Sequence, residues 1–138
     1  MMMEAAAKAA SEEGGRDLLL LAVTVLTSMD TLQLASTGID VDPEAQVLRL
    51  AGLAQQSGIS GIVCSPKEIQ SARASFGEGL RIVTPGVRPI WAAAGDQKRI
   101  MTPRDAVQAG ADWLVIGRPI TAADHPKEAY ARVVAELA

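Results

Sequence analysis

The chain has 138 residues, of which 49% are apolar and 21% charged, and its net charge at neutral pH is −3. These values exclude an intrinsically disordered chain and predict a single domain over residues 1–138, long enough to bury a core. The negative charge gives no general attraction to nucleic acid or to an anionic membrane, so we expect neither as a partner.

The cellular compartment is indicated by what the sequence lacks. The longest apolar run, residues 18–23, has the length of a strand and is far too short to span a membrane. The amino-terminal stretch has no basic region followed by an apolar core, so we do not expect a secretory signal. Cys64 is the single cysteine, which excludes an internal disulfide and fits a reducing environment. We therefore expect a cytoplasmic protein.

The first half of the chain predicts two helices around one long strand. Residues 2–12 are rich in alanine and favour a helix. Residues 17–27 are apolar on both faces, as in a parallel strand that is covered by helices. After a loop, Asp42 and Pro43 supply the cap and the first turn of a helix over residues 43–58.

The second half of the chain alternates strands with helices. Strands are predicted over residues 61–65, 81–87 and 113–118, and helices over residues 66–77, 103–110 and 125–138. A leading helix followed by four βα units predicts an α/β fold with a parallel sheet and right-handed crossovers. Two architectures fit this order: a small open doubly wound sheet, or part of a (β/α)₈ barrel.

In both architectures a ligand binds at the carboxyl ends of the strands. The polar residues there are rich in hydrogen-bond donors and positive charges, and poor in acids and bases. They are Thr27, Ser28, Ser65, Thr84, Arg88, Gln97 and Arg118. Such a set is suited to holding a phosphate. Arg118 follows Gly117 at the end of an apolar run, and two readings stay open: a charge at the solvent edge of the sheet, or a clamp for an anion that approaches the Gly117 backbone.

Other kinds of site are disfavoured. The glycine-rich motifs of dinucleotide-binding and P-loop proteins are absent. One histidine, His125, and one cysteine cannot form a zinc site, and we expect no metal or organic cofactor. His125 is predicted at the surface, Cys64 in the core without a neighbouring base, and both tryptophans as packing groups. Trp91 lies in a loop, where it could also cover a site.

Taken together, the strand ends resemble the carboxyl-terminal half of the orotidine 5′-phosphate decarboxylase family, and most closely its bacterial members. The resemblance covers nearly the whole chain and is carried by "LLLLAVTVLTSMD", "GIVCSPKE", "RIVTPGVRP" and "AGDQKRIMTPRDAVQAGADWLVIGRPIT". It implies a (β/α)₈ TIM barrel that converts orotidine 5′-monophosphate (OMP) to uridine 5′-monophosphate (UMP) and CO₂ in pyrimidine biosynthesis, without a metal or an organic cofactor.

The resemblance also implies roles for five residues. Thr27 would contact the pyrimidine, and Arg88 would bind the ligand. Gln97 would lie on the loop that closes over the phosphate. Gly117 would donate its backbone N–H to the phosphate, and Arg118 its guanidinium, which favours the anion clamp.

The chain departs from the family pattern at the catalytic motif. No Asp-x-Lys-x-x-Asp occurs in the 138 residues, so no catalytic residue is assigned. The lysines fall on predicted helices or in the loop; they are Lys8, Lys67, Lys98 and Lys127. We therefore expect a half-barrel of about four βα units that is inactive alone. The alternatives are a phosphate-binding half-barrel without catalysis, a βα fragment without affinity, or a related sugar-phosphate barrel enzyme.

Two open sheet edges and an uncovered apolar face are expected of such a half-barrel. They predict that the chain forms a homo-oligomer, most simply a dimer, or joins a complementary barrel half.

Overall fold

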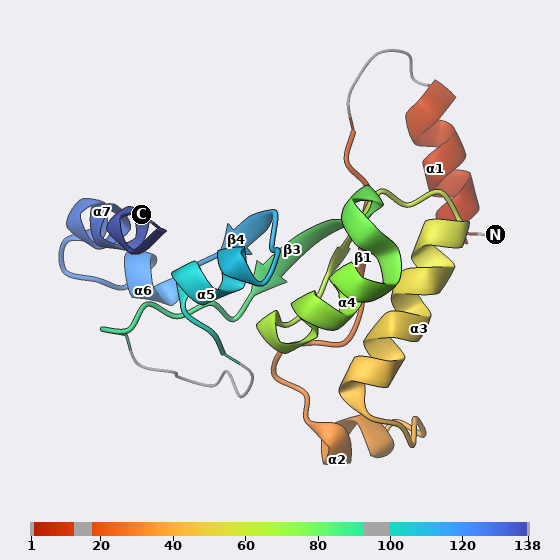
Figure 1. Cartoon of the computed structure of the whole chain (residues 1–138), viewed down its shortest axis with the longest axis horizontal. Helices are drawn as coiled ribbons and strands as arrows, with labels where there is room; N and C mark the ends of the chain where they lie inside the picture. The colour runs from red at the N-terminus through yellow and green to blue at the C-terminus, as the bar shows by residue number, and fades with distance from the viewer. Residues whose placement is uncertain (1, 13–17, 93–99, 138) are drawn as a thin grey trace.

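The computed structural model describes residues 2–12, 18–92 and 100–137, and its centre is a four-stranded parallel sheet (Figure 1). The strands are β1 (Leu21–Val23), β2 (Gly61–Val63), β3 (Arg81–Pro85) and β4 (Trp113–Val115), and they lie side by side in chain order. Parallel strands in consecutive order, each reached through a helical crossover, are the arrangement found along the wall of a barrel. The predicted α/β class and parallel sheet are confirmed.

Seven α-helices and two short 3₁₀ turns occur among the described residues. The α-helices are α1 (Met2–Glu12), α2 (Thr31–Ala35), α3 (Pro43–Gln56), α4 (Ile69–Phe76), α5 (Pro103–Gln108), α6 (Arg118–Thr121) and α7 (Pro126–Leu137). The 3₁₀ turns are η1 (Pro66–Glu68) and η2 (Gly77–Gly79). The start of α3 follows the prediction, because the Asp42 side chain accepts a hydrogen bond of 2.7 Å from the Glu44 backbone N–H.

The strands are shorter than the apolar runs that predict them. Residues 17–27 were expected to form one strand, but the ladder of β1 covers only Leu21–Val23. Pairing continues for one more residue, where the Thr24 N–H donates to the Val63 carbonyl over 3.2 Å. β1 and β4 have one described neighbour each, so the hydrogen bonds that define a strand can form on one side only.

Two short helices differ from the predictions. Residues 113–118 do not form one strand, because β4 ends at Val115 and Arg118 begins α6. The Gly117 carbonyl closes that turn by accepting from the N–H groups of Ile120 and Thr121 at 2.8 and 3.0 Å. α2 was not predicted, although Asp30 and Gln33 cap it reciprocally, each side chain bonding the backbone N–H of the other residue.

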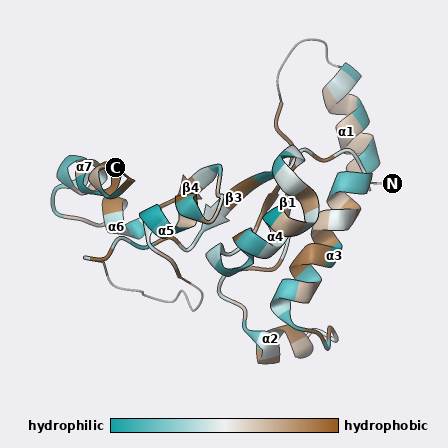
Figure 2. Ribbon diagram, in the orientation of Figure 1, coloured by the Kyte–Doolittle hydropathy of each residue, from teal (hydrophilic) through white to brown (hydrophobic). Residues whose placement is uncertain are grey.

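The main core lies between the sheet and the helices α3 and α4. Ile62 and Ile82, neighbours in the ladder, are fully buried on the helix-facing side. The helices contribute small and branched side chains to the same cluster, among them Val47, Ala51, Ile69 and Ala72. Figure 2 shows the hydrophobic colouring over the strands and the middle of α3.

The opposite side of the sheet is apolar as well, and we call it the open face. Its apolar members are Leu21, Val23, Val63, Val83, Pro85, Trp113 and Val115, and Gly61 and the charged Arg81 lie on the same face. Val23, Val63, Val83 and Trp113 are aligned in the ladder and form a row across all four strands. At the two edges this row is exposed, with 64% of Val23 and 48% of Trp113 accessible to solvent.

Across the three described stretches, the longest apolar helix still falls short of what a membrane crossing requires.

Candidate functional site

The predicted site residues that the structure describes lie beyond the carboxyl ends of the strands, on segments that the sheet holds parallel. Thr27 follows β1 and is 7% exposed, in a turn that the Met29 N–H closes on the Leu26 carbonyl at 2.9 Å. Arg88 follows β3, and Arg118 follows β4. Because β1 and β4 are the outer strands, Thr27 and Arg118 lie toward opposite edges of the sheet. Arg88 follows the inner strand β3 and lies between them.

Arg88 is a buried cation at this edge. It is 8% exposed, and its guanidinium Nη1 donates to the Val87 carbonyl at 2.9 Å. Its backbone N–H donates to the Met101 carbonyl, also at 2.9 Å, beside a parallel bridge between Val87 and Met101. The segment after the loop thus fixes the position of Arg88. A guanidinium held in low-dielectric surroundings attracts an anion more strongly than one in water.

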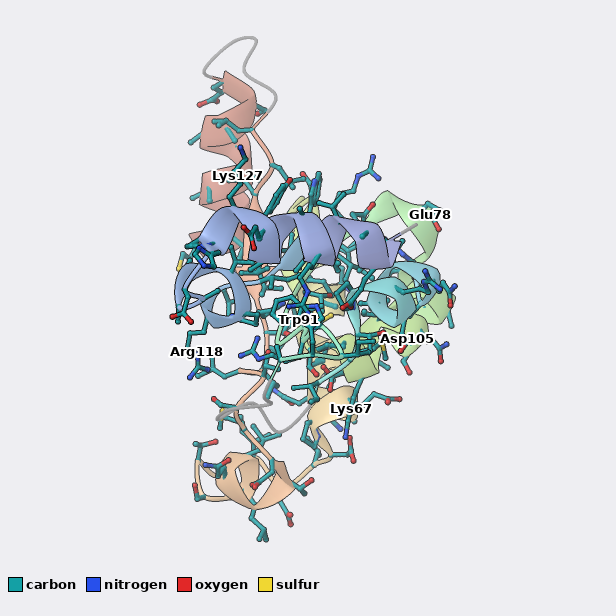
Figure 3. The ribbon with its side chains drawn as sticks, turned by 90° about the vertical axis from the view of Figure 1, so that its left-hand side faces the viewer. Lys67, Glu78, Trp91, Asp105, Arg118 and Lys127 are labelled. Carbon is teal, nitrogen blue, oxygen red and sulfur yellow. The ribbon has the colours of Figure 1, made fainter. Side chains whose placement is uncertain are left out.

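Arg118 has a different environment. It is exposed, and Figure 3 shows its side chain projecting from α6 away from the neighbouring helix. The adjoining Gly117 backbone borders open space, because a side chain added there would meet no atom within 4 Å. The turn after β4 therefore presents a permanent positive charge next to an accessible stretch of backbone. Gln97, the fifth predicted ligand residue, lies outside the described residues.

The polar residues at the ends of β2 and β3 are buried and contribute to packing. Cys64 is 1% exposed within the core, as predicted, and its backbone N–H donates to the Val83 carbonyl at 3.2 Å. Ser65 is fully buried and caps η1. Thr84 is fully buried on β3, and its hydroxyl has no hydrogen-bond partner. Thr84 and Ser65 were considered as ligand residues, and their burial removes both from the surface that a ligand could reach.

An acidic hollow of about 370 Å³ lies between the segments that follow β1 and β2 and the start of α3, and the sequence analysis did not anticipate it. Asp30, Asp42, Glu44, Glu68 and Lys67 line it, together with Thr31 and Pro43. Two of the carboxylates cap helices, and Glu44 accepts a hydrogen bond from the Ser71 hydroxyl at 2.8 Å. The described residues contain no group of three or more His, Cys, Asp or Glu side chains that could hold a metal ion. The hollow is thus accounted for by local folding.

A charged cluster at the opposite, amino-terminal edge ties β3 to β4. The Asp112 carboxylate accepts hydrogen bonds from Arg73, from Arg81 at 2.9 Å and from the Ile82 backbone N–H at 2.7 Å. Burial alone raises the pKa of Asp112, but these hydrogen bonds and the Arg73 charge outweigh it, so the pKa lies below the ordinary aspartate value. The cluster lies far along the strands from the predicted ligand residues and stabilises the sheet.

The two tryptophans have different surroundings. Trp91, on the segment after β3, stacks against the Arg132 guanidinium of α7 at 4.2 Å from the ring centre, and Figure 3 shows it beneath that helix. Trp113 lies half exposed on the open face, so the prediction that it packs in a core is not met among the described residues. His125 is exposed just before α7, as predicted.

A sequence model of the orotidine 5′-phosphate decarboxylase / HUMPS family matches residues 1–133. The chain belongs to this family. Orotidine 5′-phosphate decarboxylases of Halorhodospira halophila and Pasteurella multocida are 56% and 51% identical to it, over 137 and 136 residues. Each of these matches covers 99% of the chain but 58% of the relative, so the chain spans little more than half the length of the decarboxylases it matches.

Solved structures of the family place the same fold in longer chains. The orotidine 5′-phosphate decarboxylase of Lactobacillus acidophilus superposes with a TM-score of 0.79 at 34% identity, over 99% of this chain and 58% of that one. The enzyme of Pyrococcus horikoshii, at 24% identity and a TM-score of 0.60, shows the fold alone. The four strands are therefore part of the TIM-barrel wall of this family, and the barrel alternative of the sequence analysis is the correct one.

Proposed function

We propose that the chain forms the phosphate- and nucleotide-binding part of an orotidine 5′-phosphate decarboxylase, which converts OMP to UMP and CO₂ in the cytoplasm. The observation that carries this proposal is the identity of 51–56% with decarboxylases of two bacteria over 99% of the chain. The motifs that contain Thr27, Arg88 and Gly117–Arg118 fall within that match. No metal or organic cofactor is part of the proposal.

Each ligand residue has a role that its chemistry supports. Arg118 and the Gly117 N–H would bind the phosphate, because a guanidinium offers two parallel donors to two phosphate oxygens. Arg88, buried and held by the Val87 carbonyl, would provide a second fixed positive charge. Thr27 would contact the pyrimidine, and Gln97 would reach the ligand from the loop. A net charge of −3 makes such local cations necessary for binding an anion.

The chemical step requires a group that these residues do not provide. When the bond between the pyrimidine and its carboxylate breaks, the electron pair stays on the ring carbon, which must then receive a proton. An ammonium beside that carbon would supply the proton and stabilise the negative charge. Among the described lysines, Lys8 and Lys127 are exposed on α1 and α7, and Lys67 is exposed in η1, where it lines the acidic hollow. We propose that the 138-residue chain alone does not catalyse decarboxylation.

A second candidate function is nucleotide binding without turnover. The absence of Asp-x-Lys-x-x-Asp from the sequence favours it, since the ligand residues remain while the acid–base residues do not. We also propose that the chain associates with another polypeptide, because a sheet with two free edges tends to pair.

Calorimetric titration of UMP into the chain tests the binding role shared by both candidates. Arg118→Ala should weaken binding about ten- to a hundredfold, since a charge-assisted phosphate contact contributes about 1.5–3 kcal/mol. Arg49→Ala removes an exposed arginine from α3 without touching the strand ends, and should leave the affinity unchanged. Equal losses in the two variants would show that Arg118 contributes only general charge, and would contradict the proposal.

A further inference from the structure

Trp91 lies on the segment that follows β3 and contacts α7 through the face of its ring. The guanidinium carbon of Arg132 is 4.2 Å from the ring centre, which is the geometry of a cation–π contact. The indole N–H is buried and has no hydrogen-bond partner among the described residues. The stacking on Arg132, and not a hydrogen bond of the indole, therefore joins Trp91 to the helix.

A short, restrained stretch of backbone connects Trp91 to Arg88. The Ala92 N–H donates to the Pro89 carbonyl at 3.0 Å and closes a β-turn, and Pro89 is fully buried with a fixed φ. Just before this turn, the Arg88 N–H donates to the Met101 carbonyl at 2.9 Å. A contact that holds Trp91 in place thus also restrains Arg88.

The helix that Trp91 contacts also packs against the element that carries Arg118. α6 begins at Arg118 and lies against α7, and Figure 3 shows Trp91 beneath α7 with α6 beside that helix. α7 is itself held on α5, where Arg104 Nε donates to the Glu136 carbonyl at 3.1 Å. One anchored helix therefore contacts both the segment that carries Arg88 and the helix that carries Arg118.

We infer that Trp91 and Arg132 are a positioning pair, which holds the Arg88 segment against α7 and so fixes the spacing between Arg88 and Arg118. The inference rests on the proposed function, in which these two arginines bind the ligand. Holding both cations in their bound arrangement before the ligand arrives lowers the ordering cost of binding. Neither Trp91 nor Arg132 needs to touch the ligand for this role.

Amide hydrogen exchange of the chain without ligand, followed by NMR, tests the positioning directly. Trp91→Ala should speed exchange of the Arg88 N–H about three- to tenfold, the factor that a cation–π contact contributes. The Ile82 N–H, which donates to the Asp112 carboxylate in the sheet, is the internal control and should exchange as in the wild type. Trp91→Phe should stay within about twofold of the wild type, because it keeps an aromatic face.

Two outcomes of the exchange experiment would overturn the inference. An Arg88 N–H that exchanges at the wild-type rate in Trp91→Ala would show that the stacking does not restrain this segment. Equal acceleration at Arg88 and Ile82 would show that Trp91 contributes only to general stability.

Calorimetry with UMP and uridine tests what the positioning does for the ligand. Arg132→Ala should lower the preference for UMP over uridine about three- to tenfold, whereas Arg132→Lys should keep most of it, because an ammonium also binds an aromatic face. Lys127→Ala is the matched control, since it removes one exposed positive charge from the same helix, and it should keep the full preference. Combining Trp91→Ala with Arg132→Ala should cost no more than either change alone, because both remove the same contact.

Equal losses in Arg132→Ala and Lys127→Ala would mean that Arg132 acts only through its charge, and would overturn the inference. A wild-type preference for UMP that Trp91→Ala and Arg132→Ala both retain would support the binding role and overturn the inference as well. A wild-type chain that binds UMP and uridine equally would contradict the proposed function instead. In that case the ligand-free exchange of the Arg88 N–H would still decide whether Trp91 and Arg132 position this residue.

Discussion

Asp112→Ala should destabilise the fold more than any other exchange of a single charged group in the described sheet. Asp112 accepts from Arg73, from Arg81 and from the Ile82 backbone N–H, and its side chain is 15% exposed. Removing one partner from a fully buried ion pair costs about 3–5 kcal/mol, and the pair between Arg73 and Asp112 is part-buried. Half of the Arg81 side chain is exposed, so water can solvate its charge once Asp112 is removed. We therefore expect a loss of unfolding free energy at the lower end of this range, about 3 kcal/mol.

Urea unfolding followed by circular dichroism measures this loss, and thermal unfolding should give a Tm lower by about 10 °C for a chain of this length. Asp40→Ala is the control, because Asp40 is exposed in the loop before α3. If Asp112→Ala unfolds within about 0.5 kcal/mol of the wild type, a range typical of surface exchanges, the cluster does not join β3 to β4 as argued.

The pH dependence of stability provides an independent check of the same cluster. The pKa of folded Asp112 lies below its ordinary value, which is about 3.9 in an unfolded chain. Its contribution to stability is therefore present above about pH 4 and is lost as the pH falls through the folded pKa. The wild type should lose more stability than Asp112→Ala between about pH 5 and pH 2. Parallel curves for the two proteins would contradict the assignment.

Three further predictions concern the sheet and the site. Gly61→Ala should destabilise the fold by about 1–3 kcal/mol through overpacking, because the added carbon would lie 2.8 Å from Leu21 Cδ2 and 2.9 Å from the Arg81 carbonyl oxygen. Gly79→Ala is the control, because a carbon added there would meet no atom within 4 Å. Equal urea midpoints for the two variants would be evidence against the packing argument. Arg118→Lys should restore only part of the UMP affinity that Arg118→Ala loses, since an ammonium lacks the two-donor geometry, and calorimetry showing full recovery would mean that charge alone suffices. The purified 138-residue chain should show no decrease in OMP absorbance, and turnover that Arg118→Ala abolishes would disprove its inactivity.

Much of the fold could be predicted from the sequence because its signals are local. Apolar runs bounded by Pro and Gly predicted the four strands in their order, and Asp42-Pro43 predicted the start of α3. The boundaries were less accurate, since an apolar residue after the last ladder bond looks the same in sequence as one before it. Pro119 in the first turn of α6 was a signal for a helix that the apolar run obscured, and Asp30 with Gln33 was one for α2.

The site was less accessible to sequence reasoning than the fold. Its residue types pointed to an anion, but only the structure shows that Arg88 is buried while Arg118 is exposed. Burial of Ser65 and Thr84 depends on which way each strand faces, and a strand that is apolar on both faces does not reveal this. Trp113 is half exposed because β4 has a described neighbouring strand on one side only. No local sequence pattern encodes whether a strand lies at the edge of a sheet.

The most direct test of the central claim, a phosphate-binding edge in this chain, compares UMP with uridine by calorimetry or NMR titration. The two ligands share the pyrimidine and the ribose, so any difference in affinity comes from the phosphate. We predict that UMP binds at least tenfold more tightly, which corresponds to about 1.4 kcal/mol from Arg118 and its neighbours. Equal affinity for the two ligands would show that the chain has no phosphate site and that Arg118 is only a charge at the edge of the sheet.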